Sequence, residues 1–204
     1  MIRLRGVSKR YGAQVVLDGL DLDLPEARVT SVMGPNGAGK TTLARLLLGL
    51  AAPDAGTIDG LDGLSRAAVF QEDRLCDQLT ATGNVLLVLD RHASVSAVEA
   101  ELESVGLNAE SRAKPVRELS GGQRRRVAIV RAVMTTADLL VMDEPFKGLD
   151  AAGRALLMAY VREGGSQRTT LLITHDPDEA GWFGNHVVTI RPPGQPGCGT
   201  QGGG

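Results

Sequence analysis

The sequence predicts an α/β fold, in which buried strands alternate with amphipathic helices. One observation is the apolar run of residues 29–33, which precedes a glycine-rich loop and then leucines at helical spacing. Another is the apolar run in residues 139–144, which ends in two carboxylates and precedes a second helical pattern and the apolar strand 169–173. Parallel strands of this kind place their carboxyl ends at one sheet edge, so we expect a ligand to bind there.

The glycine-rich loop reads GPNGAGKTT and matches the phosphate-binding pattern G-x-x-x-x-G-K-[ST] at every specified position. Glycines let the loop wrap a phosphate with its N–H groups pointing inward, and the helix that begins near Lys40 adds its positive dipole end. The pattern predicts that Lys40 reaches the phosphates and that the Thr41 hydroxyl ligates Mg²⁺. A turn without a ligand is the alternative, which the flanking strand and helix disfavour. The predicted contact residues are Gly34, Pro35, Asn36, Gly37, Ala38, Gly39, Lys40, Thr41 and Thr42.

Composition argues against several classes of protein. The net charge of −2 gives no bulk reason to expect a nucleic-acid partner, so the cationic run Arg124–Arg126 is interpreted as a solvated helix face. The two cysteines, Cys76 and Cys198, lie far apart and have no neighbours at metal-ligand spacing, which argues against a disulfide framework or a zinc site. The N-terminus lacks the apolar core of a signal peptide, and we expect a cytoplasmic protein.

An antiparallel β region is predicted at the N-terminus. Residues 2–7 are interpreted as one strand, and the alternating Leu20, Leu22 and Leu24 as another with aspartates on the opposite face. Such alternation is typical of antiparallel strands with one face in water. Tyr11 lies between them in a predicted polar loop, where packing at a turn and contact with a ligand are both open.

A helical subdomain is predicted at about residues 79–134, inserted in the α/β core of a single domain that covers residues 1–191. Within it, Ser96–Glu99 is interpreted as a capping box at the start of an amphipathic helix. Residues 192–204 are rich in glycine and proline and show no apolar periodicity, so we predict that this tail is disordered.

Polar residues stand at the start of one predicted helix and at the ends of two predicted strands. The sequence LSGGQ at 119–123 starts a helix, whose dipole and free N–H groups favour an anion. Asp143 ends a buried strand and is the natural Mg²⁺ partner of the phosphate loop, while Glu144 would orient or deprotonate an attacking water. His175 ends the next strand, and its place at the same edge favours a chemical role over a structural one.

Together these segments resemble the nucleotide-binding subunit of ATP-binding-cassette (ABC) transporters over about residues 1–191. GPNGAGKTT resembles the Walker A loop, LLVMDE resembles Walker B, and LSGGQ resembles the signature of this family among P-loop ATPases. Phe70-Gln71 matches the Q-loop and His175 the switch histidine, in the family's order. The resemblance implies a P-loop NTPase fold with a RecA-like core, an N-terminal antiparallel β region and an inserted α-helical subdomain.

The resemblance also implies a role for each matched residue. Glu144 would be the catalytic base, His175 would sense the γ-phosphate, and Lys40 would hold phosphates. Tyr11 would stack on adenine with Val16 nearby. The implied Mg²⁺ ligands are Thr41, Gln71 and Asp143. The implied contacts with ATP outside the loop are Tyr11, Val16, Gln71, Ser120, Gly122, Gln123 and Asp150.

The same resemblance implies the partners. Two chains would form a head-to-tail dimer around two ATPs, because Ser120, Gly122 and Gln123 would contact the nucleotide of the opposite subunit. The second subunit is either another copy or a different cassette. Transmembrane permease subunits would dock near Glu72–Asn84, a solute-binding protein would complete the complex, and the chain would be peripheral on the inner face of the membrane.

The direction of transport rests on a short segment. Residues 69–75, VFQEDRL, are similar to subunits of nitrate, sulfonate and taurine-type uptake systems. An exporter subunit, a subunit for cofactor or metal uptake and a soluble cassette protein are the alternatives. One position departs from the family's pattern, because Lys147 places a cation in the D-loop where a small hydroxyl residue is common.

Overall fold

The structure is a computed structural model that describes residues 1–165, 167–184, 186–193 and, as backbone only, 199–202. The chain divides into two compact units, and each is described by itself. The sheet unit comprises Met1–Ala68, Ala137–Glu144 and Gly165–Gly204. The helical unit comprises Val69–Thr136 and Pro145–Gly164. None of the helices in the described residues is long and apolar enough to span a membrane.

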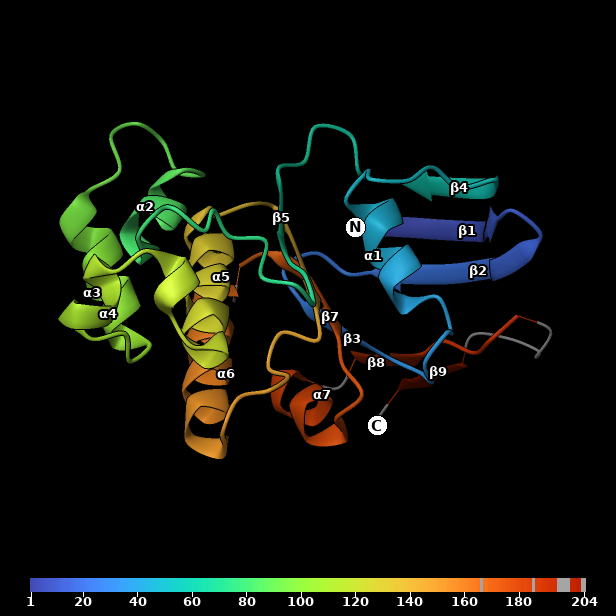
Figure 1. Ribbon diagram of the computed structural model, residues 1–204. Helices are drawn as coiled ribbons and strands as arrows, with labels where there is room; N and C mark the ends of the chain where they lie inside the picture. Colours follow the sequence, from blue (N-terminus) through green and yellow to red (C-terminus); the bar gives the residue numbers. More distant parts are fainter. Residues whose placement is uncertain (166, 185, 194–198, 203–204) are drawn as a thin grey trace. The chain divides into compact units, whose positions relative to one another are not determined.

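A three-stranded antiparallel sheet forms the N-terminal part of the sheet unit. Its strands are β1 (Ile2–Tyr11), β2 (Gln14–Leu24) and β4 (Ala55–Asp59), and β1 lies between the other two (Figure 1). The alternating leucines of β2 are buried, as the pattern predicts. Tyr11 corrects one expectation, because it is the last residue of β1 and pairs with Gln14 instead of lying in a loop. The hairpin is tighter than expected, since the left-handed backbone of Gly12 shortens the turn.

The second sheet is the predicted α/β core, with strand order β5-β6-β7-β3-β8-β9. The three strands expected from apolar runs pair in parallel, which confirms the predicted fold class. Every residue of β6 and β7 is buried, because these strands are covered on both faces. The bounds are β3 Val29–Met33, β5 Arg66–Val69, β6 Leu139–Asp143, β7 Thr169–Ile173, β8 His186–Thr189 and β9 Gly199–Gly202.

Two helices complete the sheet unit, α1 (Lys40–Leu47) and α7 (Pro177–Phe183). Helix α1 begins at the residue expected from the loop pattern. Its buried leucines join one core cluster with Leu139 and Leu171 of the parallel sheet and with leucines of β1 and β2. The loop that precedes α1 is therefore held at both ends by packed elements.

The helical unit contains α2 (Ala81–Leu86), α3 (Val95–Ser104), α4 (Ala109–Ala113), the 3₁₀ helix η1 (Val116–Glu118), α5 (Gly121–Met134) and α6 (Ala151–Gly165) (Figure 1). It is wider than the predicted insert at 79–134, because it also includes Pro145–Gly164. Whether the chain functions as one domain with an insert stays a prediction.

The start of α3 corrects the predicted capping box. Ser94 is the N-cap, with an extended backbone and a side chain that accepts a hydrogen bond from the N–H of Ala97. Ser96 instead shares a hydrogen bond with Ser94 through the two hydroxyls. The prediction was two residues late because either serine can precede the same apolar face, and Val95 is already helical. That face, Val98 and Leu102, is fully buried as predicted.

The C-terminal tail differs from the predicted disorder in one part. Gly199–Gly202 forms β9, which pairs antiparallel with β8. Strand pairing uses backbone groups alone, so a glycine-rich segment without an apolar pattern can still extend a sheet. Residues 194–198, which include Cys198, and residues 203–204 lie outside the described residues.

Burial along α1 gives a test of the core. Leu47 is fully buried, whereas Leu50 beyond the end of the helix is 60% exposed. We expect Leu47→Ala to lower the free energy of unfolding by about 2–5 kcal/mol, because it removes buried methyl groups and leaves a cavity. Leu50→Ala is the matched control and should change it by less than about 0.5 kcal/mol. Urea unfolding measures both, and equal effects would contradict the packing of α1.

Candidate functional site

The glycine loop needs glycine at its two ends because other parts of the backbone approach it closely. A Cβ on Gly34 would lie 2.3 Å from the carbonyl oxygen of Ile190. A Cβ on Gly39 would lie 2.6 Å from Leu17 and 2.7 Å from the carbonyl oxygen of Val16. Both glycines also have positive φ. The loop thus has a shape that only this residue type allows, and Val16 lies against its end.

The side chain of Lys40 folds back onto the start of the glycine loop. Its side chain is largely buried, and Nζ donates hydrogen bonds to the carbonyl oxygens of Gly34 at 2.6 Å and Pro35 at 3.0 Å. The Ala38 N–H also bonds to the Pro35 carbonyl at 3.2 Å, which tightens the turn. A fixed ammonium beside the start of an α-helix is a favourable place for phosphate oxygens. Of the other predicted contacts, Asn36 and Thr41 are exposed, and Thr42 is buried.

Asp143 lies at the carboxyl end of β6, next to the first turn of α1. Thr41 Oγ1 donates a hydrogen bond to its Oδ2 at 2.7 Å. The other oxygen, Oδ1, is buried and accepts no hydrogen bond from the described residues. Burial raises the pKa of Asp143 above its ordinary value, with Glu144 adding to the rise, and the hydrogen bond from Thr41 opposes it. An orphaned buried carboxylate oxygen beside a hydroxyl suits a divalent cation, which would supply the missing positive charge.

The described residues hold no group of three or more His, Cys, Asp or Glu side chains that could bind a metal ion by themselves. A cation at Thr41 and Asp143 would therefore take most of its ligands from elsewhere. Mg²⁺ behaves in this way, since it keeps several waters and binds one or two protein oxygens together with phosphates. The residues present therefore fit a magnesium ion that arrives with a phosphate ligand.

Glu144 and His175 meet at the same edge of the sheet. His175 Nδ1 and Glu144 Oε2 share a hydrogen bond of 2.6 Å, and the N–H of Glu144 bonds to the carbonyl of Ile173 at 2.9 Å. The Glu144 side chain is 9% exposed, whereas that of His175 is 66% exposed. Glu144 also has φ of 53°, a left-handed conformation that is uncommon outside glycine. Strained backbone of this kind is typical of functional sites.

The LSGGQ segment forms a capped helix start in the helical unit. Ser120 Oγ accepts a hydrogen bond from the N–H of Gln123 at 3.3 Å, and Gln123 Oε1 accepts one from the N–H of Ser120 at 2.9 Å. Gln123 Nε2 then donates to Ser111 Oγ at 2.9 Å. Ser120 is exposed. The segment is thus a rigid helix N-terminus open to solvent, with Gly121 and Gly122 adding no side-chain bulk.

The arginine run in α5 corrects the interpretation as a solvated face. Arg125 is only 7% exposed, and it donates to the carbonyl oxygens of Phe70 and Gln71 at 2.6 Å each. Arg126 donates to the carbonyl oxygens of Val105 and Gly106. These partners are backbone groups far away in the sequence, so no residue pattern indicated them. The side chain of Gln71 itself is exposed.

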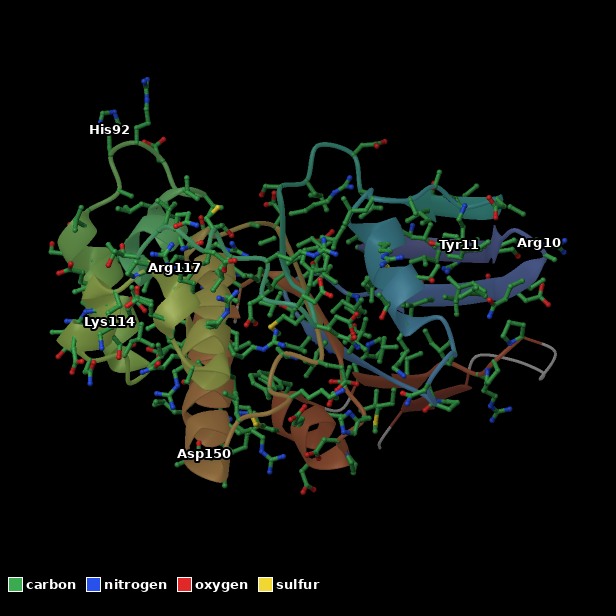
Figure 2. All side chains as sticks on the ribbon, viewed as in Figure 1. Arg10, Tyr11, His92, Lys114, Arg117 and Asp150 are labelled. Atoms are coloured by element: carbon green, nitrogen blue, oxygen red, sulfur yellow. The ribbon has the colours of Figure 1, made fainter. Side chains whose placement is uncertain are left out.

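Two other predicted contact residues lie at the ends of elements. Asp150 caps α6, since its Oδ1 accepts a hydrogen bond from the N–H of Gly153 at 2.8 Å (Figure 2). Tyr11 is 44% exposed at the tip of the β1–β2 hairpin, beside Arg10 (Figure 2). Lys9 Nζ lies 5.6 Å from the centre of the Tyr11 ring. The ring is therefore accessible, and a role in stacking stays a prediction.

The predicted residues thus fall into two groups. The sheet unit holds Tyr11, Val16, the glycine loop, Asp143, Glu144 and His175. The helical unit holds Gln71, Ser120, Gly122, Gln123 and Asp150. Within the sheet unit, the direct bonds from Thr41 to Asp143 and from His175 to Glu144 join three segments that are distant in the sequence.

Comparison with known proteins gives the same family from sequence and from structure. The profile of the ABC transporter family matches residues 17–147. The aliphatic sulfonates import ATP-binding protein SsuB 3 of Paraburkholderia xenovorans is 40% identical over 192 residues, which cover 93% of this chain and 76% of that protein. SsuB 2 of Pseudomonas savastanoi pv. phaseolicola is 39% identical over 93% of this chain and 70% of its own length.

Among solved structures, the dimeric bacterial ABC transporter cassette MJ0796 superposes with a TM-score of 0.83. The sequences are 27% identical, and the match covers 94% of each chain. A profile across most of the core, relatives near 40% identity and a matching fold agree with the loop, the carboxylates and the helix start described above. The chain belongs to the ABC transporter family, as an ATP-binding cassette.

Proposed function

We propose that this chain binds ATP at the glycine loop and hydrolyses it to drive import of an organic sulfonate through separate permease subunits. The observation that carries the proposal is the meeting of a phosphate loop with two acidic side chains at one sheet edge, joined by the Thr41–Asp143 and His175–Glu144 hydrogen bonds. Sulfonate as the solute is supported by the names of the relatives that import aliphatic sulfonates.

The sheet unit offers a separate group for each part of this reaction. Lys40 and the N–H groups of the loop would neutralise the phosphates, and Mg²⁺ held by Thr41, Asp143 and Gln71 would spread the charge that develops on them. Glu144 would accept the proton of the attacking water. His175 fixes the orientation of the Glu144 carboxylate at 2.6 Å, and its exposed ring is available to a phosphate oxygen.

The exposed start of α5 supports a site completed by a second chain. Ser120 Oγ and Gln123 Oε1 each accept one hydrogen bond in the cap, and the positive helix end at Gly121 and Gly122 would serve as an anion site. The similar cassette MJ0796 was solved as a dimer. We therefore propose a head-to-tail pair in which Ser120, Gly122 and Gln123 of one chain face the ATP of the other, with the partner either identical or a second cassette.

The membrane partners complete the proposal. Permease subunits would dock near Glu72–Asn84 and place the chain on the cytoplasmic face of the membrane, and a solute-binding protein would deliver the sulfonate. Support comes from the import role in the relatives' names and from the exposed side chains of Glu72, Asp77 and Leu79 in this segment. Reconstitution with the candidate permease tests it, because transport should require both ATP and this chain.

The base role of Glu144 gives the first test of turnover. Glu144→Gln keeps an oxygen that can accept from His175 but cannot take a proton, so we expect ATP hydrolysis to fall by about 10²–10⁴. ATP affinity by calorimetry should stay within a few-fold. Glu99→Gln, at an exposed position of α3, is the control and should hydrolyse ATP normally. Turnover within a few-fold of the original in Glu144→Gln would remove Glu144 from the chemistry.

Asp143 gives a test that needs no activity. Its folded-state pKa is raised, so at neutral pH its charge disfavours folding, and this cost fades as the pH falls through the folded-state pKa. We expect Asp143→Asn to raise the Tm of the protein free of nucleotide and metal by about 2–4 °C, the shift that corresponds to about 1 kcal/mol.

Asp138 is the matched control with the opposite sign. Hydrogen bonds from the Ser65 hydroxyl and N–H lower its pKa. Its ionised form therefore stabilises the fold at neutral pH, and that stability is lost as the pH falls through the folded-state pKa. Asp138→Asn should not raise Tm. Calorimetry at pH 7 decides, and a lower Tm in Asp143→Asn would contradict the account of its burial.

The shared site is tested at Ser120. Ser120→Arg places a bulky cation at the exposed helix start, so we expect ATP to bind the single chain normally while dimerisation with ATP and hydrolysis are both lost. Ser120→Ala removes the cap without adding bulk and should keep most activity while losing about 0.5–2 kcal/mol of stability. Light scattering and ATPase assays measure both. Full hydrolysis by a strictly monomeric sample would rule out the two-chain site.

A further inference from the structure

We propose that Arg125 is a positioning residue, which fixes the segment of residues 70–77 to helix α5 so that Gln71 moves together with the helix start at Ser120. The inference deepens the proposed function, on which it rests for the role of Gln71 toward the metal and of the segment toward the permease. The contacts that carry it lie within the helical unit.

Arg125 binds the backbone carbonyls of Gln71 and of the residue before it. Its Nη1 donates to the Phe70 carbonyl and its Nη2 to the Gln71 carbonyl, both at 2.6 Å. The guanidinium is planar and rigid, so two bonds from its two ends fix the direction of the peptide as well as its distance. Asp73 Oδ1 lies 3.3 Å from Arg125 Nη1 as an ion pair.

Arg131 repeats the arrangement further along α5. Its Nη2 donates to the Asp73 carbonyl at 3.0 Å and its Nη1 to the Arg74 carbonyl at 2.9 Å. Arg124 of the same helix pairs with the Asp77 carboxylate at 3.0 Å. One helix therefore holds the segment at several points through guanidinium side chains.

The segment depends on these bonds because it has no regular secondary structure of its own. The arginines of α5 donate to four of its carbonyls, those of Phe70, Gln71, Asp73 and Arg74, and a buried carbonyl without a donor costs free energy. Arg74 has a left-handed backbone, with φ of 47°, and its guanidinium lies 3.9 Å from the centre of the Phe70 ring. At the far end, Cys76 exchanges hydrogen bonds with Asn84 of α2.

The side chain of Gln71 is exposed while its carbonyl is fixed. The two bonds from Arg125 thus fix the backbone of Gln71 and leave its side-chain amide free to reach an ion. Arg125 lies only five residues after Ser120, or about 7.5 Å along the helix. A nucleotide that draws in Ser120 would move the Arg125 guanidinium with it, and with it the segment that the permease would meet.

Hydrogen exchange tests the attachment of residues 70–77 to α5 by Arg125 without any assay of function. In Arg125→Gln we expect the amides of residues 70–77 to exchange about tenfold faster, because charge-assisted bonds to the segment are lost. Arg117→Gln is the control, since the side chain of this exposed arginine of η1 (Figure 2) donates to the side chain of Gln78, just outside residues 70–77. Unchanged exchange in Arg125→Gln overturns the inference. Arg125→Lys, which keeps one donor group, should give an intermediate rate and serves if the glutamine variant does not fold.

A double-mutant cycle tests the link to Gln71. We expect Gln71→Ala and Arg125→Gln each to raise the Mg²⁺ concentration for half-maximal ATP hydrolysis about tenfold, and the double variant to raise it no further, because both act through one side chain. The KM for ATP at saturating Mg²⁺ should change less than threefold, which a general loss of structure would not produce. Effects that multiply in the double variant would overturn the positioning of Gln71. No change in Gln71→Ala would instead refute the metal role in the proposed function, and the exchange rates alone would then decide on Arg125.

Discussion

Asp143 ends β6 inside the protein, where the hydroxyl of Thr41 is the one hydrogen-bond donor to its carboxylate among the described residues. That bond ties the last residue of a central strand to the first turn of α1, and so sets the glycine loop against the sheet edge. Glu144 follows in the chain and is fixed in turn by Ile173 and His175. The geometry of the whole edge therefore depends on a buried charge that is only half satisfied, and the site is built to receive positive charge.

The sequence predicted the parts of the fold whose cause is local. Apolar runs located β3, β6 and β7, and the glycine pattern located the loop and the start of α1. The failures share a different cause. Arg125 was interpreted as solvated because its partners are backbone carbonyls 54 and 55 residues away. Every residue has a carbonyl, so the sequence does not indicate which ones an arginine will bind. Gly199–Gly202 pairs through its backbone alone, and Ser94 competed with Ser96 for one cap. The roles of the site residues toward ATP and Mg²⁺ remain predictions that rest on their placement.

Helix α5 combines two uses of positive charge that are easily confused in a sequence. At its start, the helix end and its glycines present backbone N–H groups to solvent, where an anion can approach. Further along, Arg124, Arg125 and Arg131 turn toward the protein and bind the segment of residues 70–77. The first use leaves N–H groups open to solvent, and the second occupies guanidinium donors with bonds inside the protein. Arg126, the last of the three consecutive arginines, likewise bonds to backbone carbonyls, those of Val105 and Gly106.

At Glu144 the backbone conformation favours a glycine, whereas the proposed reaction needs a carboxylate. With φ of 53°, the residue holds a conformation that costs a side-chain-bearing amino acid of order 1 kcal/mol and costs glycine almost nothing. A search for heat-resistant forms of this protein that scores only folding would therefore favour glycine there. Selection for thermal stability alone would therefore favour loss of this carboxylate, so stability and the proposed base role make opposite demands on one residue.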